Sequence, residues 1–371
     1  MEYEIEFHAV GDATKAGDAI SVRYGLNGVY EIMVIDGGTQ ESGAALVDHI
    51  KQHYGQGVTI AHVVSTHPDT DHASGLREIF DNFSVGNFWV HGLWHHTDTM
   101  QPYFATGQTS SGLADAIREQ YPIIKELIEQ AEQQGTAIYE PFTGASIGPF
   151  IVLSPTQHAY ERLVPQFRKT PEANQDALSA ENWWLGVRKQ SAFSAIFEKI
   201  TAAVSKWIPE IWDVELLREG SVTAAENETS TVLYGQFGET SILLTADAGV
   251  NALTWACDRA DALGIDLKVA ALTQMPHHGS RSNVTPSILN RLLGPKLPPG
   301  SAPSRFAVVS CPKDDVQHPR KMVVNAFRRR GLSVQKTQGN YYRHFSAAFP
   351  LRGTEIAAQP FEWFDSVEDY D

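Results

Sequence analysis

Residues 58–66, VTIAHVVST, form a near-continuous apolar run that has the length of a single strand. Such a run suits a strand that is buried on both faces, which is typical of the sheet in an α/β protein. Strand patterns precede it at residues 3–10, 19–25 and 30–38, and residues 43–55 have the periodicity of a helix that ends at a glycine. The sequence therefore predicts an α/β fold.

A cluster of metal-binding side chains follows this run directly, in the sequence HPDTDH at residues 67–72. Loops at the carboxyl ends of strands are where α/β sheets bind ligands, and imidazole and carboxylate groups are usual ligands of zinc, manganese and iron. Side chains two residues apart in an extended turn point the same way. His67 and Asp69 can therefore hold one ion, while Asp71 and His72 can hold a second. The alternative is a polar turn followed by a helix whose N-cap is an aspartate.

Three further strand ends carry residues of the same kind. Asp36 ends an early strand in VIDGG, and His277 and His278 follow another strand in PHHGS. Asp247 follows the second strand of an expected hairpin in TADAG, where its carboxylate can bridge two ions. Four strand ends of this type are hard to explain by solvation alone, so the sequence predicts a metal site that draws on several of them.

The motifs resemble those of a known family. THPDTDH resembles the HxHxDH signature of the metallo-β-lactamase fold, with Asp69 in place of the second histidine. The HxDxDH variant, together with HHGS, is similar to the β-lactamase-like domain of the DNA-uptake channel protein ComEC and its stand-alone relatives. Residues 10–25, 226–249 and 308–340 also resemble segments of that group. The resemblance implies an αββα sandwich of the metallo-β-lactamase type, a single domain over residues 1–371.

Carried over to this chain, the resemblance implies a site for one or two ions, Zn²⁺ or Mn²⁺. Each half of the HPDTDH motif binds one ion, Asp247 bridges them, and one histidine of PHHGS, more readily the first, completes the second site. Asp36 and Asp18 brace the loop by hydrogen bonds rather than bind metal. The implied metal ligands are His67, Asp69, Asp71, His72, His91, Asp247, His277 and His278.

One ligand of the family has no plain counterpart here. The fold usually supplies a further histidine to the first ion, for which His91, His95 and His96 in VHGLWHH are the candidates. His91 is best placed, directly after a strand, and an ordinary, partly buried histidine near aromatic residues is the alternative. If none of the three binds, the first site is weak and the enzyme works with one tightly held ion.

Such a site favours hydrolysis by a metal-bound hydroxide, because a bound ion lowers the pKa of water to about 7. We expect Asp71 to orient that water, and the oxygen ligand Asp69 to move the metal preference from zinc towards manganese. In a phosphodiesterase, Ser280 and Arg281 can bind the non-bridging oxygens, and His318 can protonate the leaving oxygen. A turn histidine before a proline is an equal alternative for His318.

The motifs favour a metal-dependent phosphodiesterase or nuclease that acts on DNA, RNA or a small nucleotide. The formal net charge of −15 argues against tight, non-specific binding of nucleic acid. The basic run at residues 320–330 can nevertheless hold a phosphate backbone, or simply end a solvated helix. A hydrolase of thioesters, lactones or β-lactams on the same fold is the second hypothesis. A metal-stabilised scaffold that binds a partner is the third, and a ligand set open to water counts against it.

The helical segment at residues 157–223 is interpreted as an insertion within the domain. Its apolar periodicity over residues 193–208 can serve packing, a homodimer, a partner protein or a substrate clamp. A single long helix is expected at residues 111–135, and the acidic residues 362–371 are expected to form a solvated edge. The chain has no apolar stretch of about 18 residues and does not begin like a signal peptide. We therefore expect a cytoplasmic protein without membrane contact.

Overall fold

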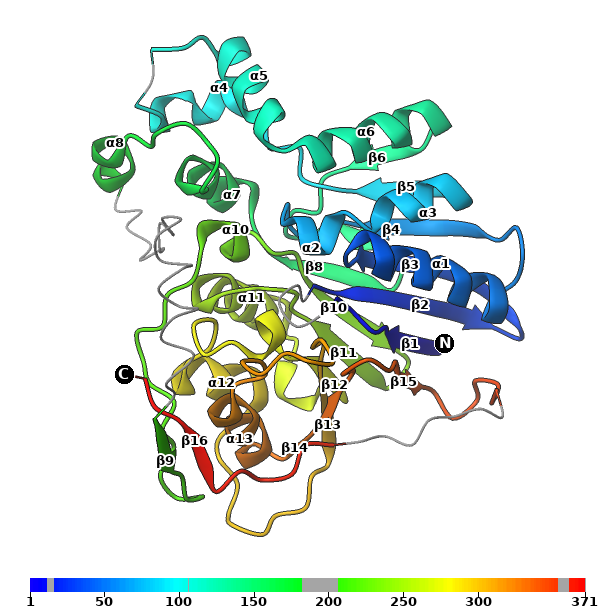
Figure 1. The fold of residues 1–371 in the computed structure, drawn as a ribbon, viewed down its shortest axis with the longest axis vertical. Helices are drawn as coiled ribbons and strands as arrows, with labels where there is room; N and C mark the ends of the chain where they lie inside the picture. The colour runs from blue at the N-terminus through cyan, green and yellow to red at the C-terminus, as the bar shows by residue number, and fades with distance from the viewer. Residues whose placement is uncertain (12–16, 106, 182–205, 353–359, 371) are drawn as a thin grey trace.

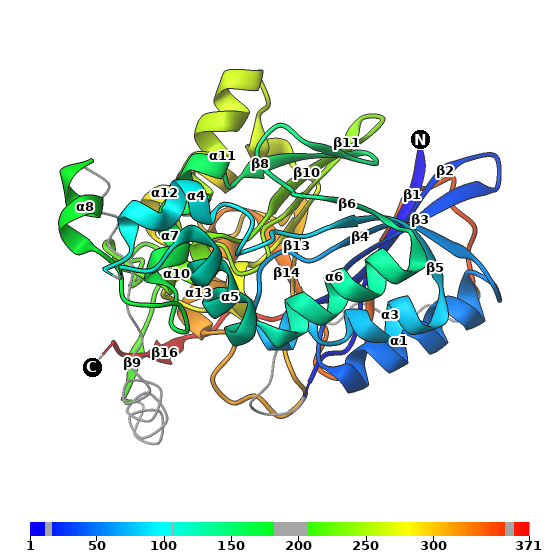
Figure 2. The same ribbon diagram turned by 90° about the horizontal axis from the view of Figure 1, so that it is seen from above.

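The computed structural model describes residues 1–11, 17–105, 107–181, 206–352 and 360–370. Two seven-stranded sheets pack face to face, and helices cover the outer face of each, so four layers follow one another in the order αββα (Figure 1, Figure 2). Apolar side chains from both sheets fill the space between them. The predicted fold class is therefore confirmed.

The first sheet comes from the N-terminal part of the chain and one strand near the C-terminus. Its order is β15 (Tyr342–Phe345), β1 (Glu2–Phe7), β2 (Ala19–Leu26), β3 (Val29–Gly37), β4 (Thr59–Val64), β5 (Ser84–Trp89) and β6 (Ala137–Tyr139). Strands β3 to β6 are parallel, and the other pairs are antiparallel. Because parallel strands end at the same edge of a sheet, the residues that follow β3, β4 and β5 lie along one edge.

The second sheet is built in the same way from the C-terminal part. Its order is β14 (Leu332–Lys336), β13 (Arg305–Val309), β12 (Leu272–Gln274), β11 (Thr240–Leu244), β10 (Val232–Phe237), β8 (Phe150–Ser154) and β7 (Ser146–Ile147). Strands β10 and β11 form the expected hairpin, and β11 to β14 are parallel. The amide of Thr231, just before β10, donates to the carbonyl of Thr66, just after β4, at 3.0 Å. This bond joins the two sheets where their ligand-bearing loops begin.

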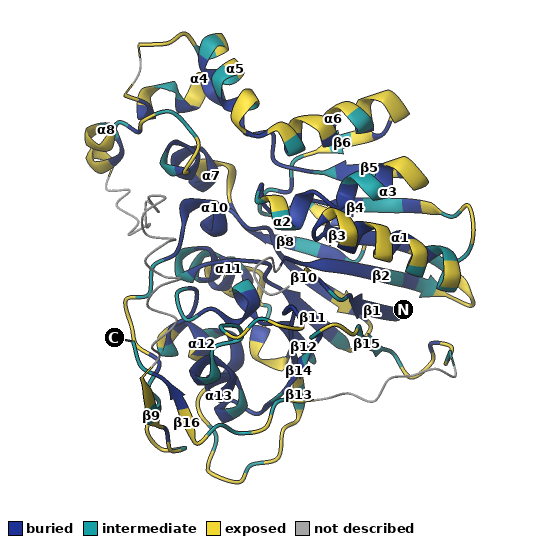
Figure 3. Ribbon diagram, viewed as in Figure 1, coloured by how far each residue is buried: buried dark blue, intermediate teal, exposed yellow. Residues whose placement is uncertain are grey.

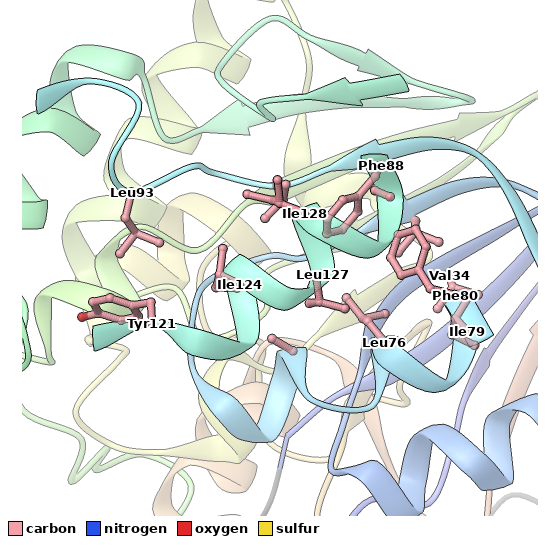
Figure 4. Packing of buried hydrophobic residues seen from close by; sticks show 14 of the residues in the cluster. Val34, Leu76, Ile79, Phe80, Phe88, Leu93, Tyr121, Ile124, Leu127 and Ile128 are labelled. Carbon is pink, nitrogen blue, oxygen red and sulfur yellow. The ribbon is translucent and has the colours of Figure 1, made fainter. Parts of the chain in front are cut away.

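Helices cover the two outer faces. On the first sheet, Ile124, Leu127 and Ile128 pack in one cluster with Phe80 and Phe88 (Figure 4), and the buried faces of the helices point towards the sheets (Figure 3). The covering helices are α1 (Gln40–His53), α3 (Leu76–Asn82) and α6 (Pro122–Gln134) on the first sheet, and α11 (Val250–Leu263), α12 (Pro286–Leu293) and α13 (Lys321–Arg329) on the second. The other α-helices of the described part are α2 (Thr70–Ala73), α4 (Thr97–Met100), α5 (Ser110–Gln120), α7 (Gln157–Leu163), α8 (Gln175–Ala180) and α10 (Ala225–Glu228).

Three glycines let the turn between α2 and α3 lie directly against β3 and α1. A Cβ atom on Gly75 would lie 2.0 Å from the carbonyl oxygen of Gly37, and one on Gly43 would lie 2.3 Å from that of Gly75. Real Cβ atoms do not approach a backbone oxygen so closely, so glycine is required at this contact. The close packing holds α2, which carries the second half of HPDTDH, against the end of β3.

Two expectations about secondary structure are wrong. The helix expected at residues 111–135 is two helices, α5 and α6, which meet at Tyr121. The reason is Pro122, which lacks an amide donor and disfavours a helical conformation at the residue before it; Tyr121 has φ −121° and ψ 61°. Most of residues 193–208 lie outside the described residues. Trp207 and Ile208 belong to a strand, β9 (Trp207–Pro209), which pairs with β16 (Ser366–Glu368).

The acidic C-terminal segment is a solvated edge only in part, since Glu362, Asp365 and Ser366 are exposed but two residues are buried. Val367 is fully buried, and the carboxylate of Glu368 accepts hydrogen bonds at 3.0 and 3.2 Å from the amide of Lys321, the first residue of α13. A carboxylate at this position complements the positive end of the helix dipole. In the described part of the chain, no helix has the length and apolar character that crossing a membrane requires.

The basic run at residues 320–330 does not present all its charges to solvent. The guanidinium of Arg329 lies 3.1 Å from the carboxylate of Glu210, and both side chains are fully buried. Arg330 is buried in the same way and lies 2.7 Å from Glu215. Neither the nucleic-acid interpretation nor the solvated-helix interpretation describes these two arginines. They instead anchor residues 210–215 to the end of α13.

Candidate metal centre

Asp247, three residues after β11, lies at the centre of a group of four histidines. Its Oδ1 atom faces Nε2 of His72 at 3.4 Å and Nε2 of His278 at 3.6 Å. Its Oδ2 atom faces Nε2 of His277 at 3.5 Å and Nε2 of His67 at 3.8 Å. The structure thus brings together three of the strand ends that the sequence singles out.

These separations suit a shared ion better than direct hydrogen bonds. Nε2 of His67, Nε2 of His72 and Oδ1 of Asp247 are buried and have no hydrogen-bond partner among the described residues. Two ligands of one tetrahedral zinc ion, each about 2.1 Å from it, are about 3.4 Å apart. In the described part of the chain, His72, Asp247 and His278 offer three ligand atoms that all lie within 4.8 Å of one another. The donor set therefore fits a divalent metal.

Hydrogen bonds at Nδ1 aim the imidazole rings at Asp247. Nδ1 of His278 donates to the carbonyl oxygen of Ser310 at 2.9 Å, and Nδ1 of His277 lies 2.8 Å from Oδ1 of Asn283. The carbonyl of Ser310 is an acceptor, so it places the proton of His278 on Nδ1 and leaves Nε2 with the lone pair that a metal needs. Nδ1 of His277 lies near both an acceptor, Oδ1 of Asn283, and a donor, Nδ2 of Asn227 at 3.0 Å. Both residues have positive φ, 45° for His277 and 53° for His278. Two consecutive non-glycine residues in this region are strained, which is typical of functional sites.

Asp36 braces the loop that carries the first two histidines. Its Oδ1 accepts from the amide of Thr66 at 2.8 Å, and its Oδ2 accepts from the Thr66 hydroxyl at 2.6 Å and from Nδ1 of His72 at 2.9 Å. Asp36, His67 and His72 also form a group with ligand atoms within 4.8 Å. We assign Asp36 to the support of His72, because its oxygens are already occupied by these donors.

Asp18 and Gly17 close the site from the side of β2. Asp18 is buried, its Oδ2 accepts from Gln274 at 2.8 Å, and burial raises the pKa of its carboxyl to about 7. The amide of Gly17 donates to Nε2 of His278 at 3.2 Å, so a metal ion bound by His278 would replace this hydrogen bond. A Cβ atom on Gly17 would lie 1.8 Å from the carbonyl oxygen of Asp71, and its φ is +101°. Only glycine fits between these two loops.

The electrostatics of the group favour a bound cation. Burial opposes charge on His72, but the carboxylates of Asp247 and Asp36 outweigh it and hold the pKa of that imidazole well above its usual value. Burial also opposes charge on Asp247, yet His277, His72 and His278 hold the pKa of its carboxyl well below its usual value. Burial lowers the pKa of His278 to about 3 and so keeps that ring neutral. The carboxylates of Asp247 and Asp36 thus favour positive charge at His72, and a metal ion would supply that charge in exchange for the proton of this imidazole.

Two predicted ligands in HPDTDH are placed differently. Asp69 accepts two hydrogen bonds from Nη2 of Arg168, at 2.8 and 2.9 Å. The Asp71 carboxylate is half-buried and makes no hydrogen bond or ion pair with any described residue. The roles of both residues in metal binding stay predictions.

The histidines of VHGLWHH form a separate group. His91 is buried between the rings of Tyr160 and Phe142, with centroids 4.5 and 4.8 Å away, and burial lowers its pKa to about 4. Nε2 of His96 lies 2.7 Å from Glu140, and Nδ1 of His95 lies 3.9 Å from the same carboxylate. Within the described residues, none of the three makes a contact with Asp247 or the four histidines around it.

The residues predicted to contact the substrate are Ser280, Arg281 and His318, and His318 is the one whose ring lies beside that of His277. Nδ1 of His318 lies 3.1 Å from the carboxylate of Asp315, and its ring is almost parallel to that of His277, 6.5 Å away. Arg281 donates to the carbonyl oxygen of Asp369 at 2.7 Å, so its guanidinium binds the C-terminal segment. Ser280 is buried and accepts from the amide of Ser282 at 3.3 Å.

Several supporting residues carry little or no signal in the sequence. The most important are Arg168, Glu226, Asp315, Asn283 and Thr66, which hold the candidate ligands in place. No motif marks Arg168, Glu226 or the bond from Thr66 to Asp36, because these contacts join residues that are distant in the chain and form only after folding. Thr66, Asn283 and Asp315 do stand near a partner in sequence. Of these, Asp315 carries a usable signal, because an aspartate three residues before His318 is typical of the start of a turn.

One part of the chain matches a family model. Residues 30–150 match the family model of the metallo-beta-lactamase superfamily, and the predicted resemblance is confirmed at this level. The ComEC-like branch stays a prediction. The sequence matches none of the curated proteins.

Several solved structures are similar over most of the chain. One is the metallo-beta-lactamase fold protein YhfI from Bacillus subtilis, with 10% identity, a TM-score of 0.41, and coverage of 93% of this chain and 100% of that one. Unliganded yeast PDE1 has 11% identity, a TM-score of 0.42, and coverage of 92% and 99%. Zn(2+)-bound PqqB from Methylobacterium extorquens has 10% identity, a TM-score of 0.40, and coverage of 92% and 99%.

Proposed function

We propose that this protein is a metal-dependent hydrolase of phosphodiesters. The observation that carries the proposal is the carboxylate of Asp247, whose two oxygens face the Nε2 atoms of His67, His72, His277 and His278 at 3.4 to 3.8 Å. We assign the metal to these residues, with His72, Asp247 and His278 as its core. When bound there, a divalent ion supplies Lewis acidity, which activates water and neutralises charge on a phosphate.

The protein's own groups supply the remaining steps. Nδ1–H of His318 donates a hydrogen bond to the carboxylate of Asp315. Nε2 is therefore the atom that would exchange a proton with the leaving oxygen. Asp315 is held in turn, because its Oδ1 accepts from the amides of Gln317 and His318 at 2.7 and 3.1 Å. This arrangement fixes the imidazole beside His277, at the rim of the metal group.

Burial of Arg329 and Arg330, two of the five cations in the basic run, favours a small substrate. Long nucleic acids need a continuous cationic surface along their backbone, but Arg329 and Arg330 point into the protein and are paired with Glu210 and Glu215. A short or cyclic nucleotide needs only the charges at the site itself. We therefore favour a small phosphodiester over a long duplex as the substrate.

The proposal is tested by hydrolysis of bis-p-nitrophenyl phosphate, of cyclic dinucleotides, and of single- and double-stranded DNA. Each assay is run in EDTA and with added Mn²⁺ or Zn²⁺, with Asp247→Asn as the variant and His62→Gln, a histidine outside the group, as the control. We expect metal-dependent cleavage that Asp247→Asn loses and His62→Gln keeps. A folded, metal-loaded protein that cleaves thioesters, lactones or β-lactams but no phosphodiester contradicts the proposal.

A further inference from the structure

Asp69 and Arg168 form an ion pair at the edge of the metal group, although 99 residues separate them in the chain. Nη2 of Arg168 donates to both oxygens of Asp69, at 2.9 and 2.8 Å. Nε and the backbone amide of Arg168 both donate to Oε1 of Glu226, at 3.0 and 2.7 Å. The two carboxylates therefore hold the guanidinium from two sides through charge-assisted hydrogen bonds.

The support beneath Arg168 is rigid. Phe167, the preceding residue, is fully buried in the cluster that fills the space under α6, together with Tyr160, Leu163 and Val164. Glu226 is almost fully buried as well. The side chain of Arg168 keeps an exposed fraction of 36%, and its hydrogen bonds to described residues come from Nε, Nη2 and the backbone amide, none from Nη1. A fixed arginine thus presents free N–H groups to solvent.

The candidate ligand atoms are distributed unevenly around the two carboxylate oxygens of Asp247. On the Oδ1 side of Asp247, His72 and His278 complete a set of three ligand atoms within 4.8 Å. On the Oδ2 side stand His67 and His277, at 3.8 and 3.5 Å from that oxygen, but among the described residues these two and Asp247 do not form a set of three ligand atoms within 4.8 Å of one another. The residue that the sequence predicts for this side is Asp69, whose carboxylate is bound by Arg168.

We propose that Arg168 takes the place of a second metal ion: Asp69 anchors its guanidinium instead of ligating metal, and Nη1 binds a non-bridging oxygen of a phosphate ester. Arginine suits this role because it is always charged and its planar fork matches phosphate oxygens. The choice of phosphate rests on the proposed function. If Arg168 replaces a second ion, each chain binds one ion tightly, and the segment at residues 157–181 supplies an anion-binding point.

Two quantities test this without any turnover: the number of metal ions per chain, measured by mass spectrometry after equilibrium dialysis, and the affinity for inorganic phosphate, measured by calorimetry. The variants are Asp69→Ala, Arg168→Ala and Arg168→Lys. The matched control is Arg291→Ala, since Arg291 also lies between two carboxylates, Asp258 and Asp261, and its side chain is 37% exposed.

We expect one tight ion in the wild type and in Asp69→Ala. Removal of Arg168 is expected to weaken phosphate binding roughly tenfold to hundredfold, the effect of one charged hydrogen-bonding partner, with a smaller loss in Arg168→Lys and none in Arg291→Ala. A second ion that appears only in Arg168→Ala, where Asp69 is released, supports the proposal too. Arg168→Lys preserves the charge and serves as the readout if Arg168→Ala does not fold.

Two tight ions in the wild type, with one lost in Asp69→Ala, would show that Asp69 is a ligand and would overturn the proposal. So would unchanged phosphate affinity in Arg168→Ala. These outcomes differ from a failure of the proposed function, which is an absence of phosphodiester cleavage in a protein that still binds metal and phosphate.

Discussion

Oδ2 of Asp36 accepts a hydrogen bond from Nδ1 of His72 at 2.9 Å, and both side chains are fully buried. The bond joins the end of β3 to α2 and keeps Nε2 of His72 directed at Asp247. Residues that support a ligand in this way set its orientation and raise its basicity.

Replacement of Asp36 by asparagine should therefore weaken the site without unfolding the protein. Asn is accepted at positive φ, which is 52° here, but it removes the negative charge beside His72. We expect metal affinity to fall roughly tenfold to hundredfold, as measured by competition with a chelator, while circular dichroism stays unchanged. An affinity equal to the wild type would argue against a supporting role.

Added Zn²⁺ or Mn²⁺ should stabilise the protein. An ion that binds only the folded state at 100 times its Kd adds about 2.7 kcal/mol to the free energy of unfolding, which corresponds to a rise of several degrees in Tm. EDTA should abolish the rise, and so should Asp247→Asn, because Asp247 contacts all four histidines. Differential scanning calorimetry gives the result directly, and a rise that persists in Asp247→Asn would place the ion elsewhere.

His91 should make stability depend on pH. Burial lowers its pKa from 6.5 to about 4, so the unfolded chain binds a proton at a higher pH than the folded one. The stability that neutral His91 contributes is present above pH 6.5 and is lost as the pH falls towards 4, at up to about 1.4 kcal/mol per unit.

His91→Phe keeps an aromatic ring beside Tyr160 and Phe142. It should remove the part of the loss of stability at low pH that His91 causes. Urea unfolding at pH 7.5, 6 and 5 measures the slope. The metal content of the variant should equal that of the wild type, and a lower content would instead identify His91 as the missing ligand.

Substitution of Arg329 should lower the free energy of unfolding and leave substrate binding unchanged. Arg329→Met leaves the carboxylate of Glu210 buried without its partner, and breaking such a pair costs about 3–5 kcal/mol. Arg77→Met, at a surface pair with Glu126, should cost less than about 1 kcal/mol. Chemical denaturation compares the two variants. If Arg329→Met is as stable as the wild type and binds DNA less tightly, the basic run faces nucleic acid after all.

Much of the fold follows from local patterns. The apolar run before HPDTDH, the hairpin before TADAG and the first three strands are confirmed, because alternation and apolar runs identify strands without reference to their neighbours. The break at Pro122 was open to the same kind of reasoning, since proline restricts the residue before it. The burial of Arg329 could not be predicted from local sequence, because a basic run has the same sequence whether carboxylates or water surround its side chains.

The sequence by itself determined which residue types stand at the strand ends: Asp36, His67, Asp247 and the pair His277–His278. That follows from chain order, because a ligand-type residue just after a buried strand must lie at the sheet edge. Only the tertiary structure decided what each carboxylate meets. Asp247 meets four imidazoles, whereas Asp69 meets Arg168 from a segment 99 residues away. A carboxylate takes the partner that packing places beside it, and packing depends on contacts across the whole chain.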